Sequence, residues 1–402
     1  MASRFGWVDQ DDRQRRAMLS VVELFKEEGT VDELGIGSIR DALADAMFPG
    51  TSVLLTRARY LLMIPWLLQQ TIDVGGQSNE AVAHFRRLEY RLIHSLLDGG
   101  EQDGVIGSQA KDNLKRMPSA AYWNALGHFG IRTPGLSIEG LLRRDIGSRL
   151  AHRRVAMPDD PGAERDTGTS SLHPDLPEPP ADLLASATLR LTAEEREFLK
   201  ERIELSTNRT LLAWLMERRL PSSADYVWQH DASRAFPTYA IDFVDAGRRF
   251  HTLVHGAALA YNSLLARERD DQRLLGHYDD LIGLWSKELA GNQPLADGWT
   301  VETLWRLMAA RGTPVKAGTQ AFVTSWVCAV AQDGADAATR PASRDLIRQR
   351  EIALKGGRAR VVNRDALNAW TGGAGMVRLD YRWAVARRLM NDILIPHGEV
   401  SA

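Results

Sequence analysis

Two histidines four residues apart carry the clearest chemical signature in this sequence. His251 and His255 are separated by one helical turn, the spacing at which two imidazoles on one helical face can ligate a metal ion. Thr252 follows the first histidine, where the metalloprotease form of this motif requires glutamate. A third ligand would have to come from the next predicted helix, where the candidates are His277, Asp279 and Asp280.

The same helical face carries further polar side chains, which together we call the polar stripe. The polar stripe consists of Arg248, His251, His255 and Asn262, at offsets of 3, 7 and 14. Small residues beside it, such as Gly256, allow a neighbouring element to approach closely, so these polar groups should be partly buried and need partners. Two interpretations follow: a metal-dependent or acid–base site around the two histidines, or a buried network that hydrogen-bonds within the fold or to a ligand. We favour the second, with no catalytic residue, metal or cofactor.

A long predicted helix, Tyr239–Arg269, must position the polar stripe. It contains no proline and only isolated glycines. Its apolar residues fall at helical spacing and cover a broad face, which is typical of a helix inserted into a protein core. They are Phe243, Phe250, Val254, Ala257, Tyr261, Leu264 and Leu265.

Further helices are predicted along most of the chain. Thr192 and Glu195 form a capping-box signature at one helix start, and Pro65 should bend or end the apolar run Tyr60–Leu68. Strand-like patterns are brief, with Ala359–Val362 as an example. The sequence therefore predicts a mainly α, multi-helical fold with two helical domains or lobes and few or no strands. The other predicted helices are Asp11–Gly29, a helix through Ile39, Leu43, Ala46 and Met47 that stops at Pro49–Gly50, Asn79–Leu97, Leu114–Arg132, Ser137–Ile146, Phe198–Leu205, Thr210–Arg219, Leu274–Leu289, Thr300–Ala310 and Lys316–Ala331.

Composition shifts suggest where the chain divides. Residues 157–181 are rich in proline, glycine and polar residues, and this composition predicts a linker. We expect a helical domain at 1–156, with a helix-turn-helix-like segment near 118–147, and a central helical domain at 182–338. A basic module at 339–402 closes the chain.

The basic module reverses the charge of the chain. Between Arg340 and Arg388 the sequence has twelve lysines or arginines and four acids, whereas the whole chain has a formal charge of −2. Trp370, Tyr381 and Trp383 could add aromatic surface, and cations beside exposed rings suit nucleic acid. In the alternative interpretation the rings lie in the core and the cations are solvated or paired. The candidate nucleic-acid-binding residues are Arg348, Arg350, Lys355, Arg358, Arg360, Arg364, Arg378 and Arg382.

A first basic cluster lies nearer the beginning of the chain, around the helix-turn-helix-like segment. Its cations could contact nucleic acid, although most helix pairs bind nothing, and a solvated basic face is the plainer interpretation. The cluster comprises Lys111, Lys115, Arg116, Arg143, Arg144, Arg149, Arg153 and Arg154.

Several function classes lack their signatures. The 402 residues contain no GxxxxGK[ST] phosphate loop and no GxSxG nucleophile elbow. The single cysteine, Cys328, cannot form an intrachain disulfide, and its apolar neighbours should keep its thiol inert. Tyr60–Leu68 is too short to span a bilayer, and no secretory signal is evident, so we expect a cytoplasmic protein without membrane contact.

Six motifs carry a resemblance to a known family. They are FGWVD (5–9), DELGIG (32–37), TRARYLLMIPW (56–66), PSAAYWNALGHFGI (118–131), HGAALAYN (255–262) and RLDYRW (378–383). With them, the chain resembles an uncharacterised bacterial family, domain of unknown function sixty-three sixty-one, over nearly all its length apart from the linker. The resemblance implies no reaction, cofactor or catalytic residue. It does imply a setting in phage-defence clusters, near helicases and phospholipase-D-like nucleases.

These observations together predict a non-enzymatic helical subunit that binds nucleic acid or a nucleoprotein partner, in a phage-defence or DNA-processing complex. The alternatives are an enzyme with a site around His251 and His255, and a protein–protein scaffold. The nucleic-acid interpretation requires that the cations of the basic module gather on one exposed face. It fails if they are consumed by internal ion pairs.

Overall fold

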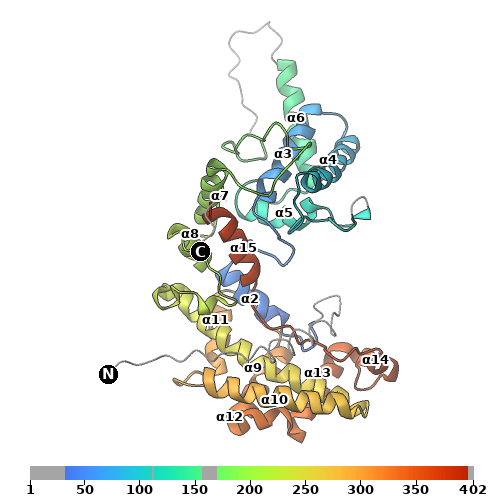
Figure 1. Ribbon diagram of the computed structural model, residues 1–402, viewed down its shortest axis with the longest axis vertical. Helices are drawn as coiled ribbons and strands as arrows, with labels where there is room; N and C mark the ends of the chain where they lie inside the picture. The colour runs from blue at the N-terminus through green and yellow to red at the C-terminus, as the bar shows by residue number, and fades with distance from the viewer. Residues whose placement is uncertain (1–31, 111–112, 156–169, 397–402) are drawn as a thin grey trace. The chain divides into compact units, whose positions relative to one another are not determined.

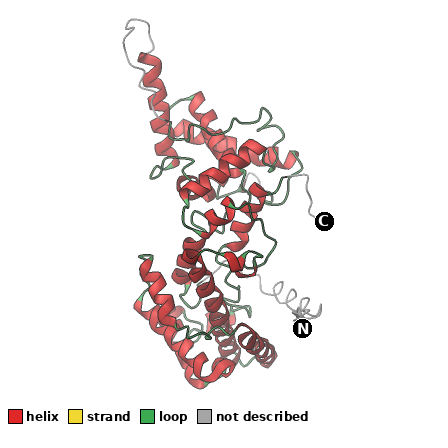
Figure 2. Ribbon diagram, turned by 90° about the vertical axis from the view of Figure 1, so that its left-hand side faces the viewer, coloured by secondary structure: helices red, strands yellow, loops and turns green. Residues whose placement is uncertain are grey.

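The computed structural model describes residues 32–110, 113–155 and 170–396, and helices dominate all three ranges (Figure 2). No strand occurs within these ranges, and an isolated antiparallel bridge joins Arg132 to Leu172. The predicted mainly α, multi-helical fold is confirmed. None of the helices in the described ranges combines the length and apolar character needed to cross a membrane. The predicted helix Asp11–Gly29 lies outside the described residues.

The chain forms two compact units, each assembled from separate parts of the sequence. Unit 1 comprises Met1–Ala42 and Asp245–Leu379, and unit 2 comprises Leu43–Val244 and Asp380–Ala402. These units follow contacts in space, whereas the predicted division at 156, 181 and 338 followed composition along the chain. That division stays a prediction.

Unit 2 contains two sets of helices. α3 (Tyr60–Val74) packs against α4 (Ser78–Asp98), α5 (Pro118–His128) and α6 (Ile138–Val155), all drawn in blue to green in Figure 1. α7 (Ala193–Ser206) and α8 (Leu211–Glu217) pack together and against α15 (Trp383–Leu394). Short 3₁₀ helices at Val227–Gln229 and Ser233–Ala235 interrupt the loop after α8.

Local sequence explains how several of these helices form. The capping box at the start of α7 is confirmed, because Thr192 Oγ1 accepts from the backbone of Glu195 at 3.2 Å and the Glu195 carboxylate accepts from Thr192 N at 3.0 Å. α3 runs unbroken through Pro65, contrary to the predicted bend or end. Pro65 removes one backbone donor, but α3 is almost wholly buried, and this burial offsets the lost bond.

Unit 1 is built around the long helix that carries the polar stripe. This helix, α9, spans Thr238–Glu268, within one residue of the predicted bounds at each end. The division of the chain into units falls inside α9, after Val244, and also inside α2 (Gly37–Met47), after Ala42. α9 and α10 lie close together because Gly256 has no side chain: a Cβ there would stand 2.1 Å from the Trp285 ring (Figure 1). The other helices are α10 (Gln272–Asn292), α11 (Val301–Ala310), α12 (Ala317–Asp333), α13 (Pro341–Lys355) and α14 (Arg364–Asn368), with 3₁₀ turns at Gly334–Ala338 and Gly356–Arg358.

Two smaller expectations need correction. Ala359–Val362 forms no strand but continues the turns after α13. Cys328 is exposed, although it stands in an apolar run. The buried side of α12 is formed by Phe322, Val323, Trp326, Val327 and Val330, and position 328 falls off this face.

Candidate functional site

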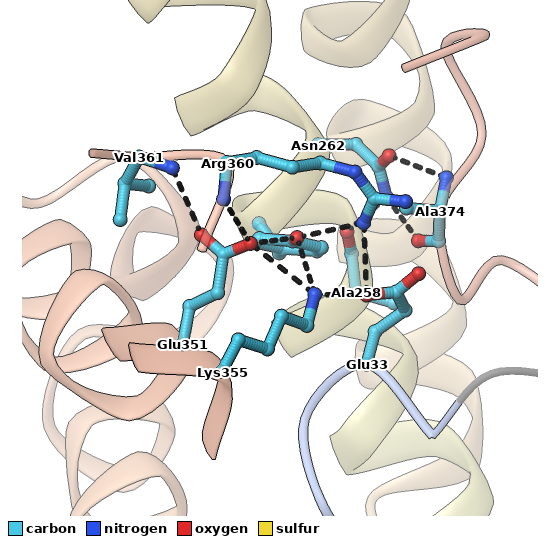
Figure 3. Close-up of polar contacts among 9 residues, drawn as sticks. Glu33, Ala258, Asn262, Glu351, Lys355, Arg360, Val361 and Ala374 are labelled. Atoms are coloured by element: carbon cyan, nitrogen blue, oxygen red, sulfur yellow. Dashed lines mark hydrogen bonds and ion pairs between the residues drawn. The ribbon is translucent and has the colours of Figure 1, made fainter. Parts of the chain in front are cut away.

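The polar stripe of α9 binds a segment of irregular backbone, residues 370–379. Asn262 is fully buried, and its side-chain amide donates to Ala374 O at 2.7 Å while its carbonyl accepts from Ala374 N at 2.8 Å (Figure 3). His251 Nδ1 lies 2.8 Å from Leu379 O. Arg269, beyond the stripe, donates to Trp370 O at 2.8 Å. Side chains of α9, together with Arg269 just after it, therefore hold this segment in place without a ladder of backbone hydrogen bonds.

His251 is locked in one neutral tautomer. The guanidinium group of Arg378 can only donate, so His251 Nε2, 2.7 Å away, must accept, and Nδ1 carries the proton that it donates to Leu379 O. Burial, and next the charge of Arg378, lower the pKa of His251 to about 4, although the bond to Leu379 opposes this. Both ring nitrogens are engaged, so neither is free for a metal ion or for proton transfer near neutral pH.

The other histidine of the stripe offers no better catalytic group. Burial, then the charges of Arg378 and His251, lower the pKa of His255 well below its ordinary value. Within the described residues, no three His, Cys, Asp or Glu side chains are grouped so that they could hold a metal ion, and this includes the predicted ligands His277, Asp279 and Asp280. Arg248 at the end of the stripe bonds to Asp245 at 3.0 Å and to Asn292 O at 3.2 Å. The geometry of the stripe is thus that of a structural network.

Most of the predicted cations of the basic module are engaged inside the fold. Among the described residues, five of the eight form ion pairs with carboxylates. The pairs are Arg348 with Glu268, Lys355 with Glu33 and Glu351, Arg360 with Glu33, Arg378 with Glu288, and Arg382 with Asp45. Arg350 is buried and donates to Leu34 O at 2.9 Å and to Thr319 Oγ1 at 2.8 Å.

A partly buried network in unit 1 shows how two of these cations are paired with carboxylates (Figure 3). Two carboxylates, Glu33 and Glu351, face two cations, Lys355 and Arg360, around the hydroxyl of Tyr261. Tyr261 donates to Glu351 at 2.6 Å, and burial, together with this carboxylate, raises the pKa of Tyr261. Burial opposes the charged form of Arg360, but its contacts with Tyr261 and Glu33 raise its pKa. The network fastens the residues before α2 to α9 and α13.

Two cations of the predicted set remain exposed. Arg364 donates to Glu268 O at 3.2 Å, and Arg358 contacts no carboxylate in the described part of the chain. Trp370, Tyr381 and Trp383, which could have added aromatic surface, are buried to 2%, 0% and 0% exposure. They belong to the core, as the alternative interpretation held. Of the eight predicted residues, only Arg358 and Arg364 are exposed without a carboxylate partner in the described part of the chain, and the three rings are buried. These eight residues therefore do not form the exposed basic face that nucleic-acid binding requires.

The first basic cluster has a different environment. Lys115, Arg116, Arg143 and Arg144 are exposed, and none of them pairs with a carboxylate of the described residues. Arg149 pairs with Asp73 on α3. Lys111 and the side chains of Arg153 and Arg154 lie outside the described part.

The helix-turn-helix-like segment is built into the core of unit 2. α5 packs on α3, and α6 packs on α3 and α4. Arg132, in the turn between α5 and α6, stacks over the Trp123 ring at 4.1 Å and donates to Trp123 O at 2.7 Å. The described segment is therefore well anchored, with Arg143 and Arg144 on its exposed side.

Three further arginines lie on α4 and were not among the predicted site residues. Arg86, Arg87 and Arg91 are exposed, and no carboxylate of the described residues pairs with them. Their charges act on a neighbour: after burial, Arg87 and Arg91 lower the pKa of His84. The sequence could have indicated that these arginines lack a carboxylate partner on their own helix, because Glu89 is the only acidic residue within four positions of any of them. Glu89 itself lies on the buried side of α4.

Unit 2 also contains a cleft of about 520 Å³ between α3, α6 and residues 170–179. Its charged groups are largely satisfied within the protein. Asp145 accepts from Ser171 N at 2.8 Å, and Arg149 pairs with Asp73. Residues 170–181, the described end of the predicted linker, are anchored here, because Trp66 Nε1 donates to Pro177 O at 2.6 Å.

Comparisons with known proteins identify a family without an assigned role. The model of a family of unknown function, DUF6361, matches residues 2–395. No curated protein and no solved structure matches the chain.

Proposed function

The chain belongs to the DUF6361 family, and we propose that it is a non-enzymatic helical subunit that binds the phosphate backbone of nucleic acid, free or within a nucleoprotein, through the exposed arginines of α4. The setting that we propose is a cytoplasmic phage-defence or DNA-processing complex, as the family resemblance implies. One observation carries the proposal: Arg86, Arg87 and Arg91 share the exposed side of one helix without a carboxylate partner in the described residues.

Unpaired cations are the form of positive charge that favours nucleic acid. An arginine already paired with a carboxylate must lose that partner before it gains a phosphate, whereas an exposed unpaired arginine only exchanges water and releases counterions from the nucleic acid. This distinction favours α4 over the basic module, where Lys355, Arg360 and Arg378 are held by Glu33, Glu351 and Glu288.

The test compares charge reversal on α4 with charge reversal at exposed arginines of the basic module. A wild-type protein that makes three phosphate contacts should lose affinity for a duplex of arbitrary sequence by at least about 40-fold between 50 and 200 mM salt, because each contact contributes about −0.9 to the log–log slope. The triple variant Arg86→Glu, Arg87→Glu and Arg91→Glu should abolish this binding in fluorescence anisotropy. The control, Arg358→Glu with Arg364→Glu, reverses the two exposed cations among the eight predicted residues of the basic module and should retain most of the binding.

Circular dichroism of each variant would show whether the helices remain folded. Duplex binding that survives the triple substitution would refute the proposal that the α4 arginines bind nucleic acid. If only the control variant lost affinity, the originally predicted module would be the site. A wild-type protein that retains no duplex at 50 mM salt, but co-purifies with a protein partner, would favour the scaffold instead.

A further inference from the structure

Two adjacent side chains of α4 hold the turn that precedes α5. The Glu89 carboxylate accepts a hydrogen bond from Ser119 N at 2.8 Å, at the start of α5. The hydroxyl of Tyr90 donates to Leu114 O at 3.3 Å. Side chains of α4 therefore hydrogen-bond to this turn at both of its ends.

This turn, between Leu114 and Ser119, carries the exposed cations Lys115 and Arg116. Neither pairs with a carboxylate in the described ranges. Both lie between the contacts made by Tyr90 and Glu89, so their backbone is fixed relative to α4. Fixing the backbone in advance reduces the entropy lost when such side chains bind a ligand.

Tyr90 also touches the arginines of α4. The guanidinium group of Arg86 lies 5.9 Å from the centre of the Tyr90 ring, and its Nη2 is 3.5 Å from the hydroxyl. One phenol thus contacts an arginine of the α4 surface and, through Leu114, the turn that carries Lys115 and Arg116. The turn and the helix face are thereby linked at a single side chain.

We infer that Tyr90 is a positioning residue that joins Lys115 and Arg116 to Arg86, Arg87 and Arg91 as one surface, whose partner is a polymeric phosphate backbone that meets all five cations at once. This inference rests on the proposed function. A mononucleotide or a single phosphate reaches too few of these cations to compete, whereas an oligonucleotide reaches all of them. The partner class is therefore a polynucleotide rather than a nucleotide ligand.

The test measures the salt dependence of duplex binding in Tyr90→Phe. Five contacts give a log–log slope of about −4.5, and three give about −2.7. Phenylalanine keeps the ring beside Arg86 but loses the hydroxyl, and with it the bond to Leu114 and the weaker contact with Arg86 Nη2. We therefore expect the slope of Tyr90→Phe to move from the first value towards the second. The double variant Lys115→Ala with Arg116→Ala should give the same shift. The exposed Tyr239, which lies in the same unit, supplies the control Tyr239→Phe, whose slope should stay at the wild-type value.

Competition supplies a second readout. A twelve-nucleotide strand should displace the labelled duplex from the wild-type protein, whereas ATP at the same phosphate concentration should not. If the wild type binds and the triple α4 variant does not, but Tyr90→Phe keeps the full slope, the inference fails while the proposed function stands. Displacement by ATP would also overturn the inference. Absence of wild-type binding overturns both.

Discussion

Replacing Glu89 by glutamine removes a buried carboxyl group whose ionisation is coupled to folding. Glu89 is 2% exposed, and its hydrogen-bond partner is Ser119 at the start of α5. Burial raises the pKa of Glu89 from 4.5 to about 7, against the opposing effects of Ser119 and of the Arg86 charge. Glutamine can still accept the Ser119 hydrogen bond but never carries the charge.

The size and sign of the effect follow from this raised pKa. Below pH 4.5 the carboxyl group is protonated in both the folded and the unfolded chain, so its titration costs nothing. Between pH 4.5 and 7 the folded state holds the proton more tightly, and the free energy of unfolding falls as the pH rises. Above pH 7 the loss is complete and amounts to about 3 kcal/mol, because each tenfold change in the proton equilibrium constant is worth about 1.4 kcal/mol.

Urea unfolding followed by circular dichroism at pH 5 and pH 8 would measure this loss, and hydrogen exchange of the α4 amides would localise it. The stability of Glu89→Gln relative to the wild type should increase by about 2–3 kcal/mol from pH 5 to pH 8. Asp98→Asn, at the exposed end of α4, is the control that replaces an exposed carboxyl group by an amide on the same helix. An advantage of Glu89→Gln that is equal at both pH values, or a glutamine variant that is less stable at pH 8, would refute the reasoning.

Two further substitutions test the packing of unit 1. Gly256→Ala should lower the free energy of unfolding by about 1–3 kcal/mol, because its Cβ would stand 2.1 Å from the Trp285 ring. The control is Gly276→Ala on α10, where no atom lies within 4 Å of the new Cβ, and it should raise the free energy of unfolding by up to about 1 kcal/mol. Equal melting temperatures of the two variants would contradict the close approach of α9 and α10. Asn262→Ala should cost about 1–3 kcal/mol and speed hydrogen exchange in residues 370–379, because Ala374 loses the partner of both its backbone groups. Exposed Asn368→Ala should change neither quantity, and unchanged exchange in Asn262→Ala would show that the amide does not hold the segment.

Helices were predictable where the pattern was long and the apolar face broad. α9 was placed within one residue at each end, and the capping box at Thr192 was read directly from two side chains. Local patterns did not show how α3 tolerates Pro65, because burial by neighbouring helices decides the outcome. The sequence also did not show which residues form each unit. Residues 32–42 and 245–379 belong to one unit through contacts between distant parts of the chain, and local patterns do not reveal such contacts.

The candidate site was harder to predict than the fold. Residue spacing predicted that the polar stripe shares one helical face, and its four residues all lie on α9. Asn262 and His251, however, bind backbone atoms of Ala374 and Leu379, and no side-chain motif in the sequence indicates such partners. The charge excess of the basic module is a property of one stretch of sequence. Ion pairs form in space, and the neutralising Glu33 and Glu288 come from other parts of the chain.

The interleaved make-up of the two units has a consequence for synthesis on the ribosome. Glu33 emerges 322 residues before Lys355, its partner in the partly buried network, and all of Leu43–Val244 is translated in between. α15, which completes unit 2, emerges only after Leu379 has closed unit 1. Neither unit can therefore finish folding as a nascent chain until nearly the whole polypeptide has been made, and a truncation after residue 156, 181 or 338 would leave both units incomplete.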